Sequence, residues 1–378
     1  MTSEDRRAAR YQRRQQKRQQ NKYKVAFCCD SFERVFTYRS LYLSAKKCFL
    51  GVGWKSSTQL YRINAVYNVF IVYEELHNGT FKSDGFFEFP LFERGKERNI
   101  RSVTIKERNV QKALCDYSLT PMLTRQLIYD NGASVKNKGY DFAIDRITLH
   151  LRRYYNKNGN KGYILLYDFS KFFDSLDHAI LKAILLKTYQ DERILKLAFH
   201  FIDMFGERGI GLGSQISQNL AMVSVNRMDH YIKEMLRIKG YARYMDDGYL
   251  IHESKEYLHK CLDDIKRMSI ELGVVLNLKK TRIAKIDKGF TFLKIRFFLT
   301  DTGKVVKKIY PKSVVRMRRK LKKYKKFVEM GKMSLKDVQQ SLESWLSHAK
   351  KLHSYRTRQS MINLYYKLFG GNYVFKNR

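Results

Sequence analysis

The sequence lacks any long apolar run. No stretch approaches the roughly 20 apolar residues that a membrane-spanning helix needs, and no signal-peptide core follows the basic N-terminus. The five cysteines form no CxxC pair and cannot all pair with one another, which indicates free thiols in a reducing compartment. The nine histidines show no zinc-ligand spacing. We therefore expect a cytoplasmic protein with no membrane partner and no structural zinc.

Acidic residues are scarce relative to basic ones. The 378 residues include 74 Lys and Arg against 36 Asp and Glu, which gives a net charge of +38. Solubility of a small domain needs a net charge of only about 2–8, so the excess indicates a polyanionic partner. Nucleic acid is the favoured partner, and an anionic membrane surface is the second possibility.

The chain is longer than the roughly 250–300 residues at which a single hydrophobic core stops growing, so we expect several subdomains. Their expected limits are a basic disordered arm at 1–24, a helical extension at 25–95, a central region at 96–300 and a basic helical region at 301–378. Helices are expected near 32–45 and 60–76, with a chain break at Pro121. In the central region, short apolar strands alternate with helices. This alternation predicts an α+β fold, with an antiparallel sheet covered by helices.

The last region carries one clear amphipathic helix. Its apolar residues recur at spacings of three and four from Val314 to Phe327, and eleven Lys or Arg fall between Lys307 and Lys326. Charges of one sign repel each other along a helix. Contact with backbone phosphates therefore explains the run better than a solvated face does.

Three aspartates follow or separate apolar strands. The run 163–167 ends at Asp168, and Asp246 and Asp247 lie between the apolar runs that flank Tyr244 and Gly248. Asp247-Gly248 is a turn signal, so we expect the pair at the tip of a hairpin. A cap at Asp168 and ordinary turn residues at 246–247 are the alternatives. Two such strands side by side would gather the three carboxylates, which is the oxygen-rich environment that hard divalent cations need.

Several motifs occur in one order between about residues 90 and 300. They are Lys-Glu-Arg-Asn-Ile at 96–100, Asp-Phe-Ser-Lys-Phe-Phe-Asp at 168–174, the glycine-rich segment 209–218, Tyr-Met-Asp-Asp at 244–247, Leu-Asn-Leu-Lys-Lys-Thr at 276–281 and Phe-Leu-Lys at 292–294. Together they resemble the motifs of reverse transcriptases, including the YxDD signature. The resemblance implies a right-hand polymerase with fingers, palm and helical thumb, which copies RNA into DNA.

The resemblance also implies roles for individual residues. Two Mg²⁺ ions, with Mn²⁺ as an alternative, would be held by Asp168, Asp246 and Asp247 and by the position of Phe169. Lys280 matches a lysine proposed to protonate the pyrophosphate leaving group. The expected contacts to substrates come from Lys96, Arg98, Lys136, Phe169, Phe173, Leu212, Gly213, Gln218 and Tyr244. Phe173 matches the aromatic position that excludes a ribose 2′-hydroxyl, and the cations would offset the charge of the triphosphate. A core phenylalanine and solvated surface charges are the plain alternatives.

The central motif departs from the common family pattern. Leu212 stands where a glutamine is usual, and Gln218 follows Ser217 where a proline is usual. This form resembles the reverse transcriptases of diversity-generating retroelements, for which it implies error-prone copying and a small basic accessory protein. A phage-defence or retron-like enzyme with a dedicated noncoding RNA is the alternative. In each case the expected partners are an RNA template, a DNA or RNA primer and dNTPs, in a bacterial or phage-encoded system.

Two rival functions remain open. An RNA-directed RNA polymerase would share the metal chemistry, but Phe173 argues against ribonucleotides. A maturase-like RNA-binding scaffold without polymerase activity would predict loss of the aspartates, and all three are present. Too few residues follow residue 301 for a retroviral-type ribonuclease H domain in addition to a thumb, so none is expected.

Overall fold

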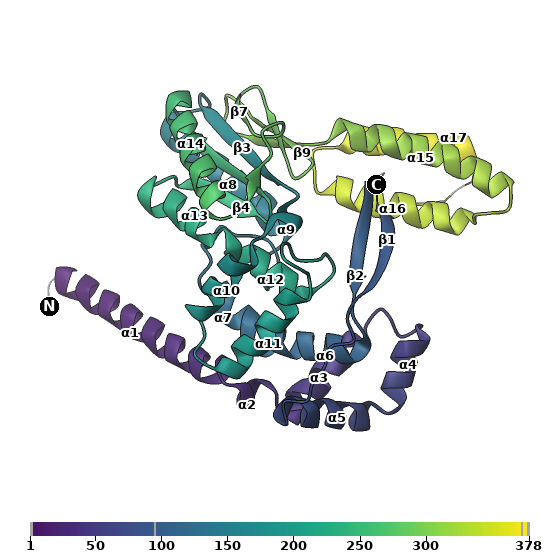
Figure 1. The fold of residues 1–378 in the computed structure, drawn as a ribbon. Helices are drawn as coiled ribbons and strands as arrows, with labels where there is room; N and C mark the ends of the chain where they lie inside the picture. The colour runs from purple at the N-terminus through teal and green to yellow at the C-terminus, as the bar shows by residue number, and fades with distance from the viewer. Residues whose placement is uncertain (1–2, 94–95, 372, 376–378) are drawn as a thin grey trace.

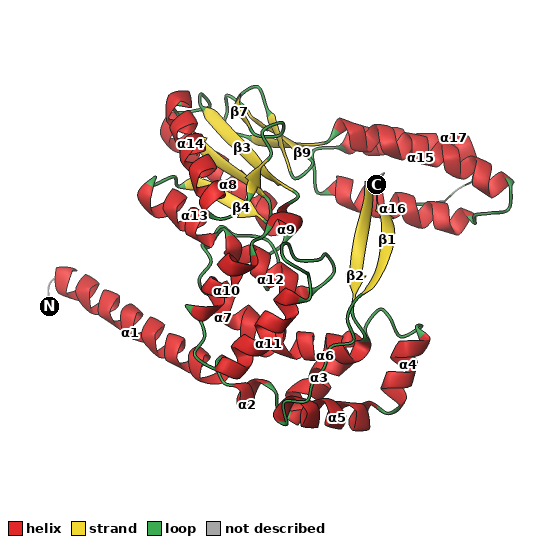
Figure 2. Cartoon of the chain, viewed as in Figure 1, coloured by secondary structure: helices red, strands yellow, loops and turns green. Residues whose placement is uncertain are grey.

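The computed structural model describes residues 3–93, 96–371 and 373–375. Figures 1 and 2 show a helical N-terminal region, a two-stranded hairpin that projects from it, a sheet flanked by helices, and a helical C-terminal unit. The strand pairs of all three sheets are antiparallel. The predicted α+β fold is therefore confirmed. No helix within the described residues is long and apolar enough to cross a membrane.

Helix α1 (Ser3–Cys29) occupies the segment for which we predicted disorder. Most of its described side chains are exposed, and Figure 1 shows it extending away from the rest of the molecule. Arg, Lys, Gln and Ala all have high helix propensity, and the segment contains neither Gly nor Pro. Intrinsic propensity is therefore sufficient to explain a helix here, although the prediction considered only the absence of an apolar face.

The next helices are shorter than predicted. They are α2 (Phe32–Val35), α3 (Tyr38–Cys48), α4 (Ser56–Ile63) and α5 (Ala65–His77). The expected helix at 32–45 is divided at Thr37, whose side chain accepts a hydrogen bond from the Ser40 amide and so caps α3. The expected helix at 60–76 is divided at Asn64. Strands β1 (Phe87–Glu93) and β2 (Lys96–Ser102) form a hairpin that we did not predict.

The prediction that Pro121 interrupts the chain after a helix is wrong, because the helical segment continues through this residue. Helix α6 (Ile105–Leu114) continues through a π-helical turn, η1 (Cys115–Leu119), into α7 (Thr120–Thr124), and Pro121 lies in the first turn of α7. A π turn changes the local hydrogen-bond spacing, which helps the helix to tolerate a residue that lacks an N–H.

The central sheet has the strand order β4-β5-β3-β6, and β7 also pairs with β3. Its strands are β3 (Tyr163–Ser170), β4 (Gly240–Tyr244), β5 (Asp247–His252), β6 (Val275–Leu276) and β7 (Arg282–Lys285). Alternate residues of β3 enter different cores: Leu165 and Tyr167 join one apolar cluster, whereas Ile164 and Leu166 join another. Both faces of this sheet are thus covered.

Helix α8 (Tyr140–Asn158) packs on one face of the central sheet, and α14 (Lys255–Glu271) packs on the other. The other helices of this region are α9 (Phe172–Ser175), α10 (His178–Leu186), α11 (Glu192–Asp203), α12 (Gln215–Ser224), α13 (Asn226–His230) and the π-helical turn η2 (Tyr231–Met235). Helices α10 and α11 begin after the N-caps Asp177 and Asp191, whose side chains accept hydrogen bonds from backbone amides of the first turn.

The boundary expected at 301–303 is a hairpin turn. It joins β9 (Ile295–Leu299) to β10 (Val305–Ile309), and β8 (Phe290–Phe292) completes this three-stranded sheet. The helical unit begins only at Pro311. It consists of α15 (Pro311–Glu329), α16 (Leu335–Lys350) and α17 (Tyr355–Phe369), which share an apolar core of their own around Leu321, Leu342 and Met361.

Candidate active site

The turn between β4 and β5 consists of Met245 and Asp246. Tyr244 pairs with Asp247, and Met245 adopts a φ of 56°. The prediction that Asp247-Gly248 forms the turn is therefore wrong, because both residues belong to β5. Glycine is needed at 248 for packing, since a Cβ there would lie 2.2 Å from the ring of Tyr167.

The three aspartates lie at one end of the central sheet. Asp168 pairs with Asp247 in the β3–β5 register, and the Phe169 amide donates to the Asp246 carbonyl at 3.3 Å. Burial, together with the nearby charges of Asp246 and Asp168, raises the pKa of Asp247 to about 7. Burial, followed by the charge of Asp168, also raises the pKa of Asp246. The carboxylates are thus close enough to repel one another.

Lys280 partly offsets this negative charge. Its ammonium donates to both carboxylate oxygens of Asp168, at 2.9 and 2.7 Å, and Asn277 Nδ2 donates to the same group at 3.2 Å. The hydrogen bond to Asp168 raises the pKa of Lys280, which is therefore protonated at neutral pH. Its side chain is 59% exposed, so the ammonium can move away from Asp168 at little cost.

The described residues contain no group of three or more His, Cys, Asp or Glu side chains arranged as ready metal ligands. The donor chemistry at 168, 246 and 247 nevertheless fits a divalent ion. Carboxylate oxygens are the ligands that Mg²⁺ prefers, and a divalent cation would relieve the repulsion that raises the two pKa values.

A buried ion pair lies beneath the turn between β4 and β5. The Arg243 guanidinium bonds both carboxylate oxygens of Asp229, with Nε at 2.9 and 3.0 Å and Nη2 at 2.6 Å, and both side chains are fully buried. Arg243 Nη1 also donates to the Met245 carbonyl at 2.8 Å. The Tyr241 hydroxyl donates to Asp229 and bonds the hydroxyl of Tyr167. This network fixes the turn residue that precedes Asp246.

Sequence reasoning missed this pair. Arg243 stands directly before Tyr244, and Asp229 lies on α13, so no spacing signal links them. The only local indication was a charged residue within an apolar strand, a position at which burial requires a partner.

Phe169 and Phe173 flank the turn that follows β3. Phe169 is buried and stacks on Phe172 with a centroid separation of 5.3 Å, whereas Phe173 is half-buried with its ring edge-on to Phe172. Lys171, with a φ of 46°, turns the chain into α9.

The glycine-rich segment lies against the residues after Phe173. The Ile210 amide donates to the Phe173 carbonyl at 2.8 Å, and the Gly209 amide donates to Leu176. Gly209 and Gly213 both have positive φ, and a Cβ at 209 would lie 2.8 Å from the Asp174 carbonyl oxygen. The fold thereby brings the segment that carries half-buried Leu212 and exposed Gly213 next to Phe173.

The other predicted substrate residues are more dispersed. Lys96 and Arg98 lie on β2, but their side chains fall outside the part of the chain that the structure describes. Lys136 is exposed in a turn before α8. Its segment approaches the β4–β5 hairpin through the bridge between Asn131 and Arg243, and Ser134 Oγ donates to the exposed Gln218 at 3.4 Å. Tyr244 is half-buried beside Gly132.

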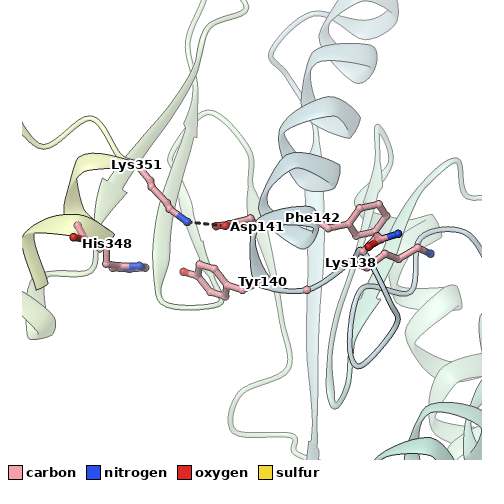
Figure 3. A pocket seen from close by; sticks show the side chains of 9 residues that line it. Lys138, Tyr140, Asp141, Phe142, His348 and Lys351 are labelled. Atoms are coloured by element: carbon pink, nitrogen blue, oxygen red, sulfur yellow. Dashed lines mark hydrogen bonds and ion pairs between the residues drawn. The ribbon is translucent and has the colours of Figure 1, made fainter. Parts of the chain in front are cut away.

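A cavity of about 510 Å³ separates the start of α8 from α16 (Figure 3). The Lys351 ammonium bonds the Asp141 carboxylate across it at 2.6 Å, and the rings of Tyr140 and His348 lie 5.8 Å apart. The Tyr140 hydroxyl also donates to the Leu293 carbonyl at 3.0 Å, in the β8–β9 turn.

Comparison with known proteins gives one family match. Residues 82–297 match the family model described as reverse transcriptase (RNA-dependent DNA polymerase). These residues include the three aspartates, Lys280 and the glycine-rich segment. A search of curated proteins gives no significant match.

Among solved structures, telomerases show a weak similarity. The apo telomerase of Candida tropicalis truncated from its C-terminal domain is 19% identical over 59% of this chain and 55% of that one, with a TM-score of 0.45. The Candida albicans telomerase in complex with a TWJ fragment of telomeric RNA is 12% identical over 73% and 54%, with a TM-score of 0.47. The apo C. tropicalis enzyme is 14% identical over 76% and 59%, with a TM-score of 0.45. The chain thus matches little more than half of each telomerase.

Proposed function

The chain belongs to the reverse transcriptase (RNA-dependent DNA polymerase) family, and we propose that it extends a primer along an RNA template. The observation that carries this proposal is the meeting of Asp168, Asp246 and Asp247 at one end of the sheet. All three carboxylates are present among the matched residues, which favours an active polymerase over a maturase-like scaffold.

Asp168 and Asp246 would hold both divalent ions, Mg²⁺ or Mn²⁺, with Asp247 and the position of Phe169 as supporting ligands. When bound, the ions would activate the primer hydroxyl and neutralise the leaving pyrophosphate. The buried Arg243–Asp229 pair keeps the turn rigid, so the Asp246 carboxylate is oriented before substrate arrives.

The remaining roles belong to the chain's own side chains. Lys280 is protonated and exposed, and it would donate a proton to the pyrophosphate once released from Asp168. Phe173 would exclude a 2′-hydroxyl by its bulk, and Leu212, Gly213 and Tyr244 would contact the nascent base pair. Gln218 would support the same surface from α12.

Cations outside the carboxylate end would bind the phosphates. Lys96, Arg98 and Lys136 would offset the charge of the incoming triphosphate. Residues 25–95 would extend the fingers, 96–300 would form fingers and palm, and the helices after Pro311 would form a thumb whose basic face follows the duplex backbone.

Primer extension on an RNA template tests the activity. The wild-type chain should incorporate dNTPs in the presence of Mg²⁺ and reject NTPs. Asp246→Asn should lower the extension rate at least a thousandfold while RNA affinity changes little, because RNA is held mainly by cations. Asp145→Asn, an exposed aspartate on α8, is the matched control and should behave as wild type. Substantial extension by Asp246→Asn would refute the site, and incorporation of NTPs would refute the role of Phe173.

Within the family, we propose an error-prone enzyme of a diversity-generating retroelement, with a small basic accessory protein. Leu212 supports this proposal, because an aliphatic side chain cannot make the hydrogen bonds that a glutamine would make near the templating pair. Leu212→Gln should lower the error rate, as measured by sequencing the cDNA. An unchanged error spectrum would show that Leu212 does not determine the error rate.

The second candidate is a bacterial antiviral-defence or retron-like reverse transcriptase with a dedicated noncoding RNA. The charge of +38 suits either partner. Sequencing the nucleic acid that co-purifies distinguishes the two: a single structured RNA supports defence, and a repeat-derived template supports diversification.

A further inference from the structure

A second charged region lies at the opposite end of the β4–β5 hairpin from the aspartates. A cavity of about 480 Å³ opens there between α8, the segment that joins η2 to β4, and the end of β5. Strand β5 begins at Asp247 and reaches the cavity at Ile251 and His252. At roughly 3.4 Å per residue, the cavity lies about 15 Å from the carboxylates. It is therefore separate from the candidate active site.

Four cationic side chains line this cavity. Arg153 and Lys157 lie one turn apart on α8, and Arg237 and Lys239 lie in the segment before β4. All four residues are exposed, and none forms an ion pair with a described residue. Arg153 and Lys157, four residues apart on a helix, repel each other weakly, so an anion bound between them would be favoured.

Two other cations near the cavity, Arg146 and Lys233, are paired with a carboxylate. Arg146 Nε and Lys233 Nζ bond the carboxylate of Asp130 at 2.5 and 2.7 Å. The cavity itself has one carboxylate, Glu253, which accepts a hydrogen bond from Asn158. Its positive charge is therefore largely uncompensated.

The cavity walls also offer flat rings. The rings of His252 and Tyr257 lie 4.5 Å apart at 39°, and Tyr154 lines the α8 side, where its hydroxyl donates to the Lys161 carbonyl at 2.7 Å. His150 lies deeper, and burial lowers its pKa to about 4, so it is neutral at physiological pH. Rings beside cations suit a ligand with a planar base and phosphates.

We propose that this cavity binds a phosphorylated nucleotide, either as a free nucleoside triphosphate or as one unit of an RNA strand. Arg153, Lys157, Arg237 and Lys239 contact the phosphates, and the base lies against the rings of Tyr154 and Tyr257. The volume lies within the range of about 300–1,000 Å³ that ligand pockets occupy. The site adds a second nucleotide contact that the polymerase reaction does not use.

The test compares two double variants of the full chain. Arg153→Gln/Lys157→Gln removes two charges from the cavity, whereas Arg152→Gln/Lys196→Gln removes two exposed helical charges outside it. The probes are ATP and a ten-nucleotide single-stranded RNA, each titrated in EDTA at 0.15 M salt. EDTA removes metal-dependent binding at the aspartates. Primer extension in Mg²⁺ is measured in parallel.

We expect the cavity variant to weaken binding of at least one probe about tenfold, because two charge-assisted contacts are lost. The control pair should change affinity less than twofold. Loss of ATP binding identifies a free nucleotide as the ligand, and loss confined to RNA identifies a strand. Equal effects of the two pairs, or no binding of either probe, would overturn the proposal.

The parallel assay separates this site from the polymerase. The cavity variant should retain the wild-type extension rate on a pre-annealed primer–template. If the wild-type chain binds the probes as expected but fails to extend primers, the proposed function fails and the cavity site stands.

Discussion

The two ends of the β4–β5 hairpin gather charges of opposite sign in different surroundings. One end holds Asp168, Asp246 and Asp247 with Lys280 as the counter-charge. The other end holds four cations with one carboxylate. The aspartates are buried or half-buried, and the cations are exposed.

The difference shows what each kind of site requires from the fold. Water screens exposed cations, so they can gather at little cost. Half-buried carboxylates lose much of that screening, and their crowding must be stabilised by the surrounding core. The Arg243–Asp229 pair lies beneath the negative end only, where it holds the Met245 carbonyl in place.

The largest expected effect comes from breaking that support. Asp229→Asn leaves the fully buried Arg243 guanidinium without its counter-charge, so the free energy of unfolding should fall by about 3–5 kcal/mol. Urea denaturation followed by circular dichroism measures the change. Asp263→Asn breaks an exposed ion pair with Lys266 and should cost less than about 1 kcal/mol. Similar losses in both variants would mean that burial does not increase the contribution of the Arg243–Asp229 pair.

The next prediction concerns the crowding of carboxylates. Without divalent ions at pH 8, Asp247→Asn should raise the free energy of unfolding by about 1–2 kcal/mol, because it removes a half-buried charge and its repulsion of Asp246. Thermal unfolding in EDTA measures this gain, and the stabilisation that Mg²⁺ gives the wild type should shrink. Asp145→Asn is the control. A destabilised Asp247→Asn variant would show that repulsion between the carboxylates does not lower the stability of the wild-type chain.

The smallest effect is expected for the exposed cationic face of α15, and it concerns the salt dependence of nucleic-acid binding. Neutralising Lys322, Lys323 and Lys325 on α15 should reduce the slope of log affinity against log salt by up to about 0.9 per lost phosphate contact, if the B-DNA coefficient is borrowed. Fluorescence anisotropy with a primer–template duplex at several salt concentrations measures the slope.

The control for the α15 lysines removes the same charge elsewhere. It neutralises three exposed lysines on or near other helices, namely Lys187, Lys196 and Lys260. If the two triple variants lower the slope equally, the α15 lysines act only through net charge.

The sequence predicted the fold and the aspartates because both depend on local patterns. Apolar runs define β3 and β5, and Asp168, Asp246 and Asp247 stand at their ends, so one strand pairing brings them together. The turn could not be located in the same way. Gly248 looked like a turn residue, although its small size is required by the neighbouring Tyr167 ring.

Other features depend on contacts between distant segments. The Arg243–Asp229 pair forms only when α13 packs beneath β4, and Arg153 and Arg237 reach the same cavity from separate elements. Neither arrangement has a fixed sequence spacing. The exposed helix α1 was missed for a different reason, because propensity alone favours it and no packing pattern marks it.

Tyr140 joins three parts of the molecule, namely α8, the β8–β9 turn and α16. Tyr140 is the first residue of α8, and its hydroxyl donates to the Leu293 carbonyl in the β8–β9 turn. Its ring lies beside His348 of α16 (Figure 3). Rotation of the helical unit away from α8 would separate the His348 ring from Tyr140 and break the adjacent Lys351–Asp141 ion pair. One residue, Tyr140, therefore contacts both the helical unit and the turn between β8 and β9.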